Sequence, residues 1–347
     1  MHMKDFPRRF AMVALLALST ASSIAAQRLS ALATPRQELI HIWGYSGLAP
    51  LLISWEDAYE ARHPEVHFEN HLNSPATVMA GLYNGVADLA LMGREIWPVE
   101  TMAYHWVYQQ QPFGLVVLTA GLNAPDQSFT PVVLVNASNP LTSISLSQLD
   151  AIYGSEHRIA NANVRTWGEL GLTGKWAQQP IHAYGFGPED SLGVCFRHDV
   201  LRLDFKPNPA SNLLSDHDNA TTSAAQRITH AIASDPYAIG YTRSPRSSAV
   251  RLLAVASPTV IWPSEATVAS HQYALTRSIS IYCKRFPGKS LDPTINQFLH
   301  FLLSPEAQKL VRPSEGFLPL NAILLKQQRE KLDAPLPTAS GSEWKEQ

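Results

Sequence analysis

The spacing of apolar residues along the chain alternates between the period of a β-strand and that of an α-helix. Short strands and helices are therefore predicted to follow one another. Residues 39–43 form a short apolar run typical of a strand, which leads into a turn containing Gly and Ser. Leu52, Trp55 and Tyr59 then fall on one helical stripe, which ends before Pro64. A strand that leads through such a turn into a helix directs free backbone N–H groups and the positive end of the helix dipole toward one point. The sequence therefore predicts a site for a small anion at residues 41–64.

The same alternation continues along most of the chain. Further strands are predicted at residues 66–70, 87–92, 115–119, 132–136, 181–184, 238–241 and 279–283. Helices are predicted at residues 78–83, 146–152, 192–200 and 224–232, and Ser145 is the expected cap of the second of these. Residues 295–303, with Ala307 and Leu310, predict the closing helices. Junctions like the first recur at residues 70–80 and 180–196. Alternating strands and helices predict an α/β fold with largely parallel sheets.

Composition narrows the possible partners. The chain has 347 residues, of which 45% are hydrophobic, so two domains or one large domain can be built. A net charge of -2 argues against nucleic acid or a membrane surface as the main partner. The two cysteines, Cys195 and Cys283, lie in apolar runs, so we expect two separately buried thiols, with a disulfide as the alternative.

No motif for a metal or an organic cofactor is found in the sequence. His63, His67 and His71 are spaced four residues apart, which would suit a metal only on a continuous helix. Pro64 and the strand pattern after it interrupt such a helix. We therefore expect no metal site and no cofactor.

The N-terminal residues predict export from the cytoplasm. Basic residues precede a short apolar run at residues 10–18, and Ser- and Ala-rich sequence follows, as in a secretory signal peptide. Cleavage after Ala25, or as late as Ala33, would follow the small-x-small rule. With no Cys near either position to carry a lipid, the expected location is periplasmic or secreted.

Four stretches in one order carry a resemblance to a known family. They are LTSISLSQLDAIYG, then TWGELGLTGKW with PIHAYG, then ASDPYAIGYTRSP, and finally YALTRSISIYCKRFPGKSLDPTINQFLHFLLSPEAQKLV with GFLPL. Together they resemble the phosphate-type solute-binding proteins of bacterial ABC importers, which are periplasmic binding proteins. The resemblance extends from about residue 38 to residue 322, and its most specific part is the closing segment.

The resemblance implies a type II periplasmic-binding-protein fold, with two α/β lobes, each a mostly parallel sheet flanked by helices, and a ligand cleft between them. Its chain order implies that residues 36–130 plus 271–324 form lobe one and that residues 131–270 form lobe two. It also implies a monomer that binds a small ligand without catalysis and passes it to the membrane permease of an ABC importer. Residues 325–347 are polar and contain Pro, so we expect a disordered tail.

In such proteins the anion is held by loop hydroxyls, helix N-terminal amides, an arginine and, in some members, an aspartate that accepts a ligand proton. In the first loop, Gly47 stands where the family often has Thr, and Ser46 lies beside it. Ser46 would donate its hydroxyl or only begin the helix, and Gly47 would offer its N–H. In the second loop, Ser74 and Thr77 retain hydroxyls that would contact the ligand.

The third loop, ALMGREI, resembles the family's Met-Ser-Arg-Glu form, with Gly93 in place of the Ser. Arg94 follows the end of a predicted strand, where a guanidinium can bind an oxyanion through two hydrogen bonds. An ion pair with Glu95 or another acid is the competing interpretation.

The fourth loop departs most from the family pattern. Phe186 occupies the position of the family's ligand-contacting Arg, and Asp190 and Ser191 stand in the Ser-Gly-Thr segment. Ser191 would donate at a helix start, while Asp190 would cap that helix or bind a ligand proton. Losing an Arg partner should weaken the binding of a dianion, since each hydrogen bond to a charged group contributes about 1.5–3 kcal/mol.

The sequence therefore predicts an extracytoplasmic protein that captures phosphate or a related oxyanion for an ABC importer. A family member that binds another small solute, or acts as a sensor, is the first alternative. A secreted hydrolase is the second, but the Gly-x-Ser-x-Gly pattern is broken at Glu189 and no nucleophile with a base is apparent.

Overall fold

The computed structural model describes residues 38–122, 129–203, 206–216, 220–245 and 247–336. The predicted signal peptide lies outside these residues. Among the described residues, no helix combines the length and the apolar character needed to cross a bilayer.

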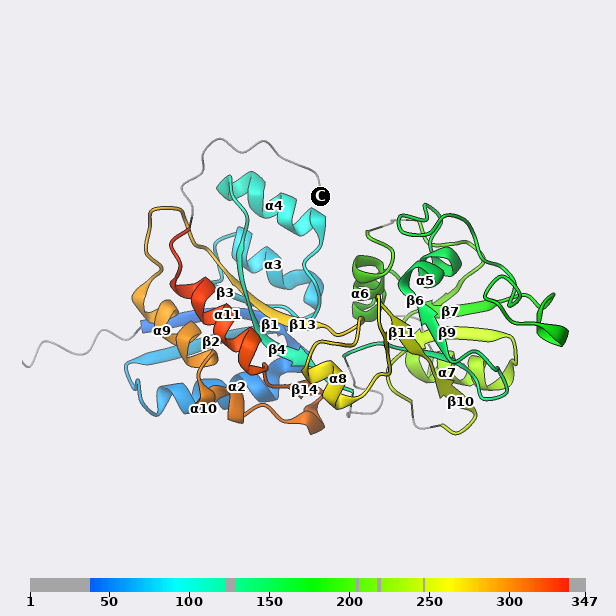
Figure 1. Cartoon of the computed structure of the whole chain (residues 1–347). Helices are drawn as coiled ribbons and strands as arrows, with labels where there is room; N and C mark the ends of the chain where they lie inside the picture. The colour runs from blue at the N-terminus through cyan, green and yellow to red at the C-terminus, as the bar shows by residue number, and fades with distance from the viewer. Residues whose placement is uncertain (1–37, 123–128, 204–205, 217–219, 246, 337–347) are drawn as a thin grey trace, which may run out of the picture.

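Strands and helices alternate over the described chain, as Figure 1 shows. The strands are Glu38–Tyr45 (β1), Val66–Asn73 (β2), Leu89–Leu91 (β3), Phe113–Ala120 (β4), Val132–Asn136 (β5), Ser143–Ser145 (β6), His182–Phe186 (β7), Asn212–Leu214 (β8), Ala238–Thr242 (β9), Val250–Leu252 (β10), Ala254–Ala256 (β11), Val260–Ile261 (β12), Ser278–Cys283 (β13) and Phe317–Leu318 (β14). The α-helices are Ala49–Glu60 (α2), Pro75–Tyr83 (α3), Pro98–Tyr108 (α4), Leu146–Tyr153 (α5), Ser191–Asp199 (α6), Ala224–Ser234 (α7), Glu265–Ala269 (α8), Pro293–Leu302 (α9), Pro305–Lys309 (α10) and Ala322–Asp333 (α11).

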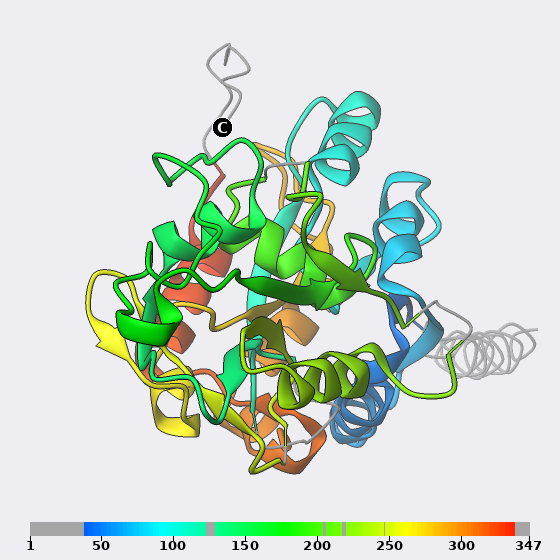
Figure 2. The same cartoon turned by 90° about the vertical axis from the view of Figure 1, so that its right-hand side faces the viewer.

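The strands divide between two lobes, which lie side by side in Figure 1 and one behind the other in Figure 2. A six-stranded sheet in the order β14-β4-β13-β3-β1-β2 forms the centre of lobe one. Lobe two contains a five-stranded sheet, β10-β5-β9-β7-β8, and a small sheet, β12-β11-β6. The predicted two-lobed α/β architecture is confirmed.

The prediction of mostly parallel sheets is wrong, because both large sheets are mixed. β1 is parallel to β2 and β3, but β13 is antiparallel to both of its neighbours, β3 and β4. β4 carries the chain out of lobe one and β13 carries it back through the same edge of the lobe, so the two strands run in opposite directions. In lobe two, β5 is likewise antiparallel to β9 and β10, while β7 is parallel to β8 and β9.

Each lobe has its own hydrophobic core. In lobe one, Trp55 of α2 is fully buried, and its indole N–H donates to the carbonyl of Ala307 at 2.9 Å. In lobe two, the rings of Phe196 and Tyr241 stack in parallel with centroids 3.7 Å apart. Cys195 and Cys283 are both buried and free, which confirms the expectation of two separate thiols.

The expectation of a disordered tail is wrong for residues 325–333, which belong to α11. Asn321 caps this helix by accepting from the N–H of Leu324 at 3.0 Å. The side-chain oxygen of Gln328 accepts from the N–H of Val116 at 3.0 Å, and Leu332 is buried against lobe one. The helix is therefore held by contacts with distant residues of lobe one. Residues 337–347 lie outside the described part of the chain.

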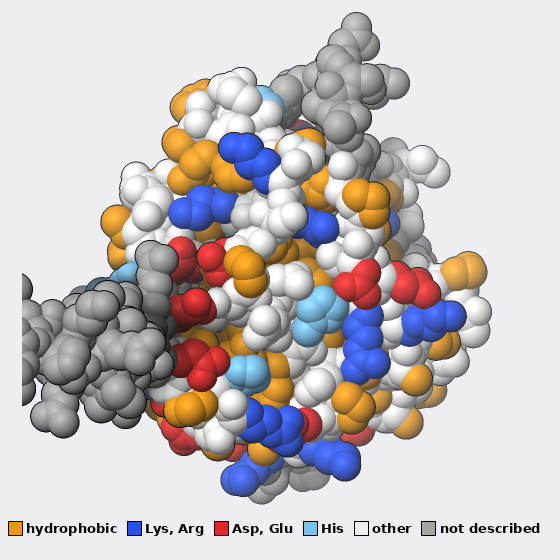
Figure 3. All heavy atoms as spheres, turned by 90° about the vertical axis from the view of Figure 1, so that its left-hand side faces the viewer, with side chains coloured by type: hydrophobic (Ala, Val, Ile, Leu, Met, Phe, Trp, Pro, Cys, Tyr) orange, Lys and Arg blue, Asp and Glu red, His pale blue; other side chains and the backbone are white. Residues whose placement is uncertain are grey.

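The outer face of lobe one carries interspersed acidic, basic and histidine side chains, as Figure 3 shows. The imidazoles of His67 and His71 lie 3.7 and 3.3 Å from the carboxylates of Glu60 and Glu69. Within the described ranges, no group of three or more His, Cys, Asp or Glu side chains is arranged to hold a metal ion.

Glu56 gives the stability of lobe one a predicted dependence on pH. This side chain of α2 is only 7% exposed, and desolvation raises the pKa of its carboxyl to about 7, although Asn70 donates to it at 2.8 Å. Because the pKa is higher in the folded chain than in the unfolded chain, the folded state is favoured at low pH and loses this advantage as pH rises toward 7. We expect Glu56→Gln to stabilise the protein at pH 8 by about 1–2 kcal/mol, with a smaller gain at pH 5. Urea unfolding of both proteins at the two pH values measures this, and an equal gain at both would contradict it.

Candidate functional site

Three of the predicted loops meet at one edge of the lobe-one sheet. β1 lies between β2 and β3 and is parallel to both, with Tyr45 opposite Asn73 and Gly44 opposite Leu91. The carboxyl ends of these strands, and the loops that follow them, therefore lie side by side. Ser46 and Gly47 begin the segment before α2, the second loop leads into α3, and the third contains Arg94.

The hydroxyls of the second loop organise the start of α3. Ser74 is the N-cap of α3, and its oxygen accepts from the N–H of Ala76 at 3.4 Å. The hydroxyl of Thr77 donates to the carbonyl of Ser74 at 2.9 Å. Both side chains are exposed, as are Ser46 and Gly47 in the first loop. Ligand contact by these four residues remains a prediction.

Arg94 forms an ion pair with an acidic residue, which is the predicted alternative to direct binding of an oxyanion. Its two terminal nitrogens lie 2.9 and 2.7 Å from the two carboxylate oxygens of Glu100, in the first turn of α4. Nη1 also donates to the carbonyl of Glu95 at 2.8 Å, and the side chain is only 7% exposed. Glu100 in turn accepts from the N–H of Trp97 at 2.8 Å, so Arg94 helps to hold the start of α4.

A tyrosine ring occupies the space beside both glycines of these loops. A Cβ atom on Gly47 would lie 2.4 Å from the Tyr45 ring, and one on Gly93 would lie 2.3 Å from it. The ring of Phe129 packs edge-on against Tyr45, with centroids 6.0 Å apart. A side chain at position 47 or 93 would therefore require the Tyr45 ring to move.

In lobe two, Asp190 precedes α6 and is buried. It occupies the N-cap position, but its side chain makes no capping hydrogen bond. Oδ1 instead accepts from the N–H of Asp216 at 3.4 Å, while the buried Oδ2 has no hydrogen-bond partner among the described residues. Burial raises the pKa of the Asp190 carboxyl above its ordinary value. Ser191, the first residue of α6, is half-buried.

Phe186 lies in the hydrophobic core of lobe two. Its ring is 1% exposed. The guanidinium of Arg243 lies over this ring, 5.8 Å from its centroid, and 3.8 Å from the carboxylate of Asp216. Arg243 directly follows β9, and neither Arg243 nor Tyr45 is among the site residues predicted from the sequence.

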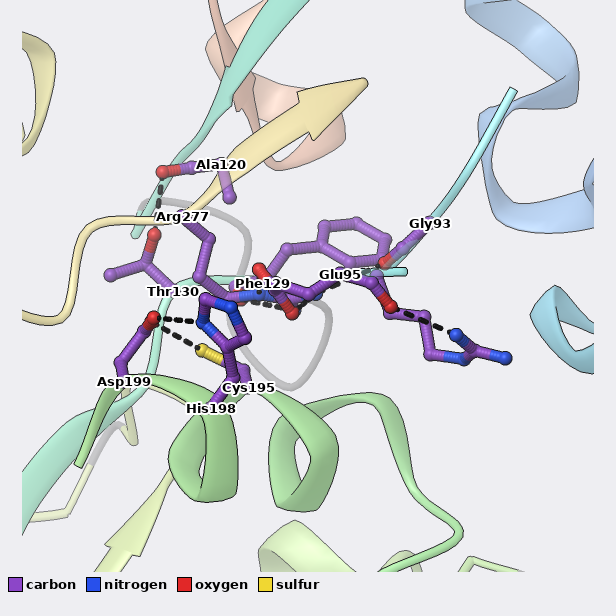
Figure 4. Close-up of polar contacts among 10 residues, drawn as sticks. Gly93, Glu95, Ala120, Phe129, Thr130, Cys195, His198, Asp199 and Arg277 are labelled. Carbon is purple, nitrogen blue, oxygen red and sulfur yellow. Dashed lines mark hydrogen bonds and ion pairs between the residues drawn. The ribbon is translucent and has the colours of Figure 1, made fainter. Parts of the chain in front are cut away.

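The lobes approach each other closely along α6, which is drawn beneath lobe one in Figure 4. The guanidinium of Arg197 on α6 lies 5.1 Å from the centre of the Trp97 ring in lobe one. A polar cavity of about 280 Å³ lies between the lobes, lined by Arg94, Glu95, Ile96, His198, Asp199, Thr276, Arg277, Ser278, Ser280 and Tyr282.

A buried arginine lies on the lobe-one side of this cavity. Arg277, which is 0% exposed, binds the carboxylate of Glu95 through two hydrogen bonds of 3.0 and 3.1 Å. It also donates to the carbonyls of Phe129 and Gly93 at 2.9 and 3.2 Å (Figure 4). Opposite it, the imidazole of His198 lies 2.7 Å from the carboxylate of Asp199. All charged groups named here have ionic or hydrogen-bonded partners, as expected for a structural support of the cleft.

Comparison with known proteins identifies relatives that cover most of the chain. A model of the PBP superfamily domain matches residues 29–306. The phosphate-binding protein PstS of Pseudomonas aeruginosa PAO1 is 27% identical over 285 residues, which is 80% of this chain and 82% of that protein.

Two solved structures share the fold. An ABC-type phosphate transport receptor from Vibrio cholerae aligns with a TM-score of 0.56 at 19% identity, over 80% of this chain and 99% of the other. PstS from Borrelia burgdorferi aligns with a TM-score of 0.58 at 16% identity, over 82% and 100% of the two chains. At these identities the structural similarity describes the fold alone.

Proposed function

The chain belongs to the PBP superfamily domain family, and on that premise we propose that it captures phosphate or a related small oxyanion in the cleft between its lobes. The main observation in support of this proposal is the arrangement of the N-termini of three helices. α2 and α3 begin at one edge of the lobe-one sheet, and α6 begins in lobe two after β7. Helix N-termini attract anions through free N–H groups and the helix dipole. The name of the relative from Pseudomonas aeruginosa supports phosphate as the first ligand to test.

In this proposal the protein binds its ligand without chemical conversion. Ser46, Gly47, Ser74 and Thr77 contact the anion from lobe one, and Asp190 and Ser191 contact it from lobe two. Arg94 acts by holding the third loop through its pair with Glu100 rather than by binding the anion itself. The relative from Pseudomonas aeruginosa is named a phosphate-binding protein, which supports capture of a ligand rather than catalysis.

Residues 36–130 with 271–324 form one closing unit and residues 131–270 form the other. Strands β1–β4, β13 and β14 share one sheet, and β5 and β7–β10 share another, which supports this division. The ligand bridges the units and favours their closed arrangement. In this proposal the protein acts outside the cytoplasm as a monomer, in keeping with its N-terminal sequence. It delivers the ligand to an ABC importer permease, as the resemblance of its sequence to the binding proteins of such importers implies.

Thermal or urea unfolding with a panel of anions tests the proposal. Purified protein, dialysed into phosphate-free buffer, is unfolded with phosphate, sulfate, molybdate or a small carboxylate. A ligand at 100 times its dissociation constant is expected to add about 2.7 kcal/mol of stability. We expect phosphate or another tetrahedral oxyanion to give this shift. Stabilisation by a carboxylate alone, or turnover of any compound in the panel, would contradict the proposed function.

A further inference from the structure

Two residues outside the predicted site lie beside the positions at which its loops have no polar side chain. Gly47 has no side chain, and Phe186 places an apolar ring in the core. Beside each of these residues the structure has a different polar group, the phenol of Tyr45 in lobe one and the guanidinium of Arg243 in lobe two. We propose that Tyr45 and Arg243 bind the anion from opposite lobes and that Arg243 is its main cationic partner.

The place of Arg243 follows from the order of strands in lobe two. β9 lies beside β7 and is parallel to it, with Gly240 opposite Tyr184. The chain therefore leaves β9 at Arg243 next to the point where it leaves β7 for the loop before α6. The hydroxyl of Tyr241 donates to the carbonyl of Phe186 at 2.9 Å and joins the two strand ends. Arg243 thus extends from the edge that also carries the N-terminus of α6.

The surroundings of Arg243 favour a role in binding over one in the core. Its guanidinium is held on one side by the Phe186 ring at 5.8 Å and on the other by Asp216 at 3.8 Å. A cation over an aromatic face and near a carboxylate is held in one orientation, and a guanidinium can bind an oxyanion through two hydrogen bonds. The side chain is 17% exposed, so a small ligand can reach it.

Tyr45 is the last residue of β1 and lies at the sheet edge from which the first loop begins. Its phenolic oxygen lies 2.9 Å from the position that a Cβ atom on Gly47 would occupy, so it takes the place of a hydroxyl at residue 47. Edge-on packing by Phe129 limits the movement of the ring. Burial lowers the pKa of the Arg243 guanidinium, while the nearby Asp216, Tyr45 and Asp190 act in the opposite direction.

The buried oxygen of Asp190 is an independent sign of a ligand at this point. A buried carboxylate oxygen normally has a hydrogen-bond partner, yet Oδ2 of Asp190 has none among the described residues. The side chain is 7% exposed and lies at the start of α6, close enough to Asp216 and Arg243 to interact electrostatically with both. A hydroxyl of a protonated oxyanion would satisfy this oxygen while its other oxygens face Arg243 and Tyr45.

Isothermal titration with inorganic phosphate tests the inference, which rests on the proposed function. We expect Arg243→Gln to weaken phosphate binding about 10- to 100-fold, since it removes hydrogen bonds to a charged group. Tyr45→Phe is expected to weaken binding about 3- to 10-fold through the loss of one hydrogen bond. Arg243→Lys keeps the charge and is expected to fall between wild type and Arg243→Gln. The matched controls are Arg158→Gln and Tyr83→Phe. Arg158 is an exposed arginine of lobe two that pairs with Glu156, and Tyr83 lies at the far end of α3.

The outcomes separate this inference from the function on which it rests. If wild type binds phosphate and both Arg243→Gln and Tyr45→Phe bind it equally well, the assignment of these residues is overturned while the proposed function stands. If wild type binds no oxyanion at all, both are overturned. Circular dichroism and ligand-free melting temperatures show whether each variant is folded. If Arg243→Gln does not fold, the assignment is tested with Arg243→Lys and Tyr45→Phe instead. Phosphate affinity equal to that of wild type in both variants would again overturn the assignment.

Discussion

Arg277→Met is expected to destabilise the protein by about 3–5 kcal/mol, because it leaves a charge buried without its partner. Arg277 is fully buried and provides four hydrogen bonds, two to the carboxylate of Glu95 and one each to the carbonyls of Phe129 and Gly93. Met keeps much of the volume but donates nothing. Urea unfolding followed by tryptophan fluorescence measures the loss. Since Gly93 adjoins the Tyr45 ring, we also expect weaker anion binding.

Two further variants show whether the buried charge is the cause. In Arg277→Met with Glu95→Gln the uncompensated carboxylate is absent, so part of the lost stability should return. Arg62→Met breaks an exposed pair with Glu306 and should cost less than about 1 kcal/mol. If Arg277→Met were no more harmful than Arg62→Met, the buried network would contribute little to the fold.

Gly193→Ala is expected to destabilise the protein by roughly 3 kcal/mol, although Ala is normally favoured over Gly in a helix by about 1 kcal/mol. Gly193 lies in the first turn of α6, where a Cβ atom would be 1.9 Å from the carbonyl oxygen of Gly187. Two backbone segments would have to separate, because neither can turn away as a flexible side chain can. The start of α6 would move with Asp190 and Ser191, so phosphate affinity should fall as well.

Gly171→Ala serves as the control for backbone strain. Gly171 has a positive φ of 89°, but a Cβ atom there would meet nothing within 4 Å. It should cost only about 1–2 kcal/mol, the strain of a left-handed residue, and leave anion binding unchanged. Equal stability of Gly193→Ala and wild type, with equal phosphate affinity, would mean that α6 is not held at this contact.

Local signals predicted several elements correctly. Ser145 caps α5 as expected, accepting from the N–H of Gln148 at 3.1 Å, and β5 has the predicted bounds. Such features depend on residues a few positions apart, which a sequence displays directly. α11 was missed because few of its residues are apolar, and its support comes from distant groups such as Val116. α4 was missed because Trp106 and Val107 are exposed and leave no clear apolar stripe.

The candidate site shows the same division. The loops with Ser46, Ser74 and Ser191 were found because each follows a predicted strand and begins a predicted helix. Arg94 lines the cavity between the lobes, but its pairing with Glu100 could not be predicted, because the start of α4 has no clear signal in the sequence. Arg243 was overlooked because it is 57 positions from Phe186, and only the pairing of β7 with β9 brings them together.

The sequence by itself determined the family and most of the alternation of strands and helices, and it predicts which loops can face an anion. These follow from periodicity, turn residues and motifs, which act over short stretches of chain. The tertiary structure decided the mixed direction of the sheets, the pairing of Arg94 with Glu100, and the meeting of Tyr45 with Gly47 and Gly93. It also brought Arg243 over Phe186. Which charges and rings meet depends on strand order and on the packing of the two lobes, and neither is encoded in the spacing of nearby residues.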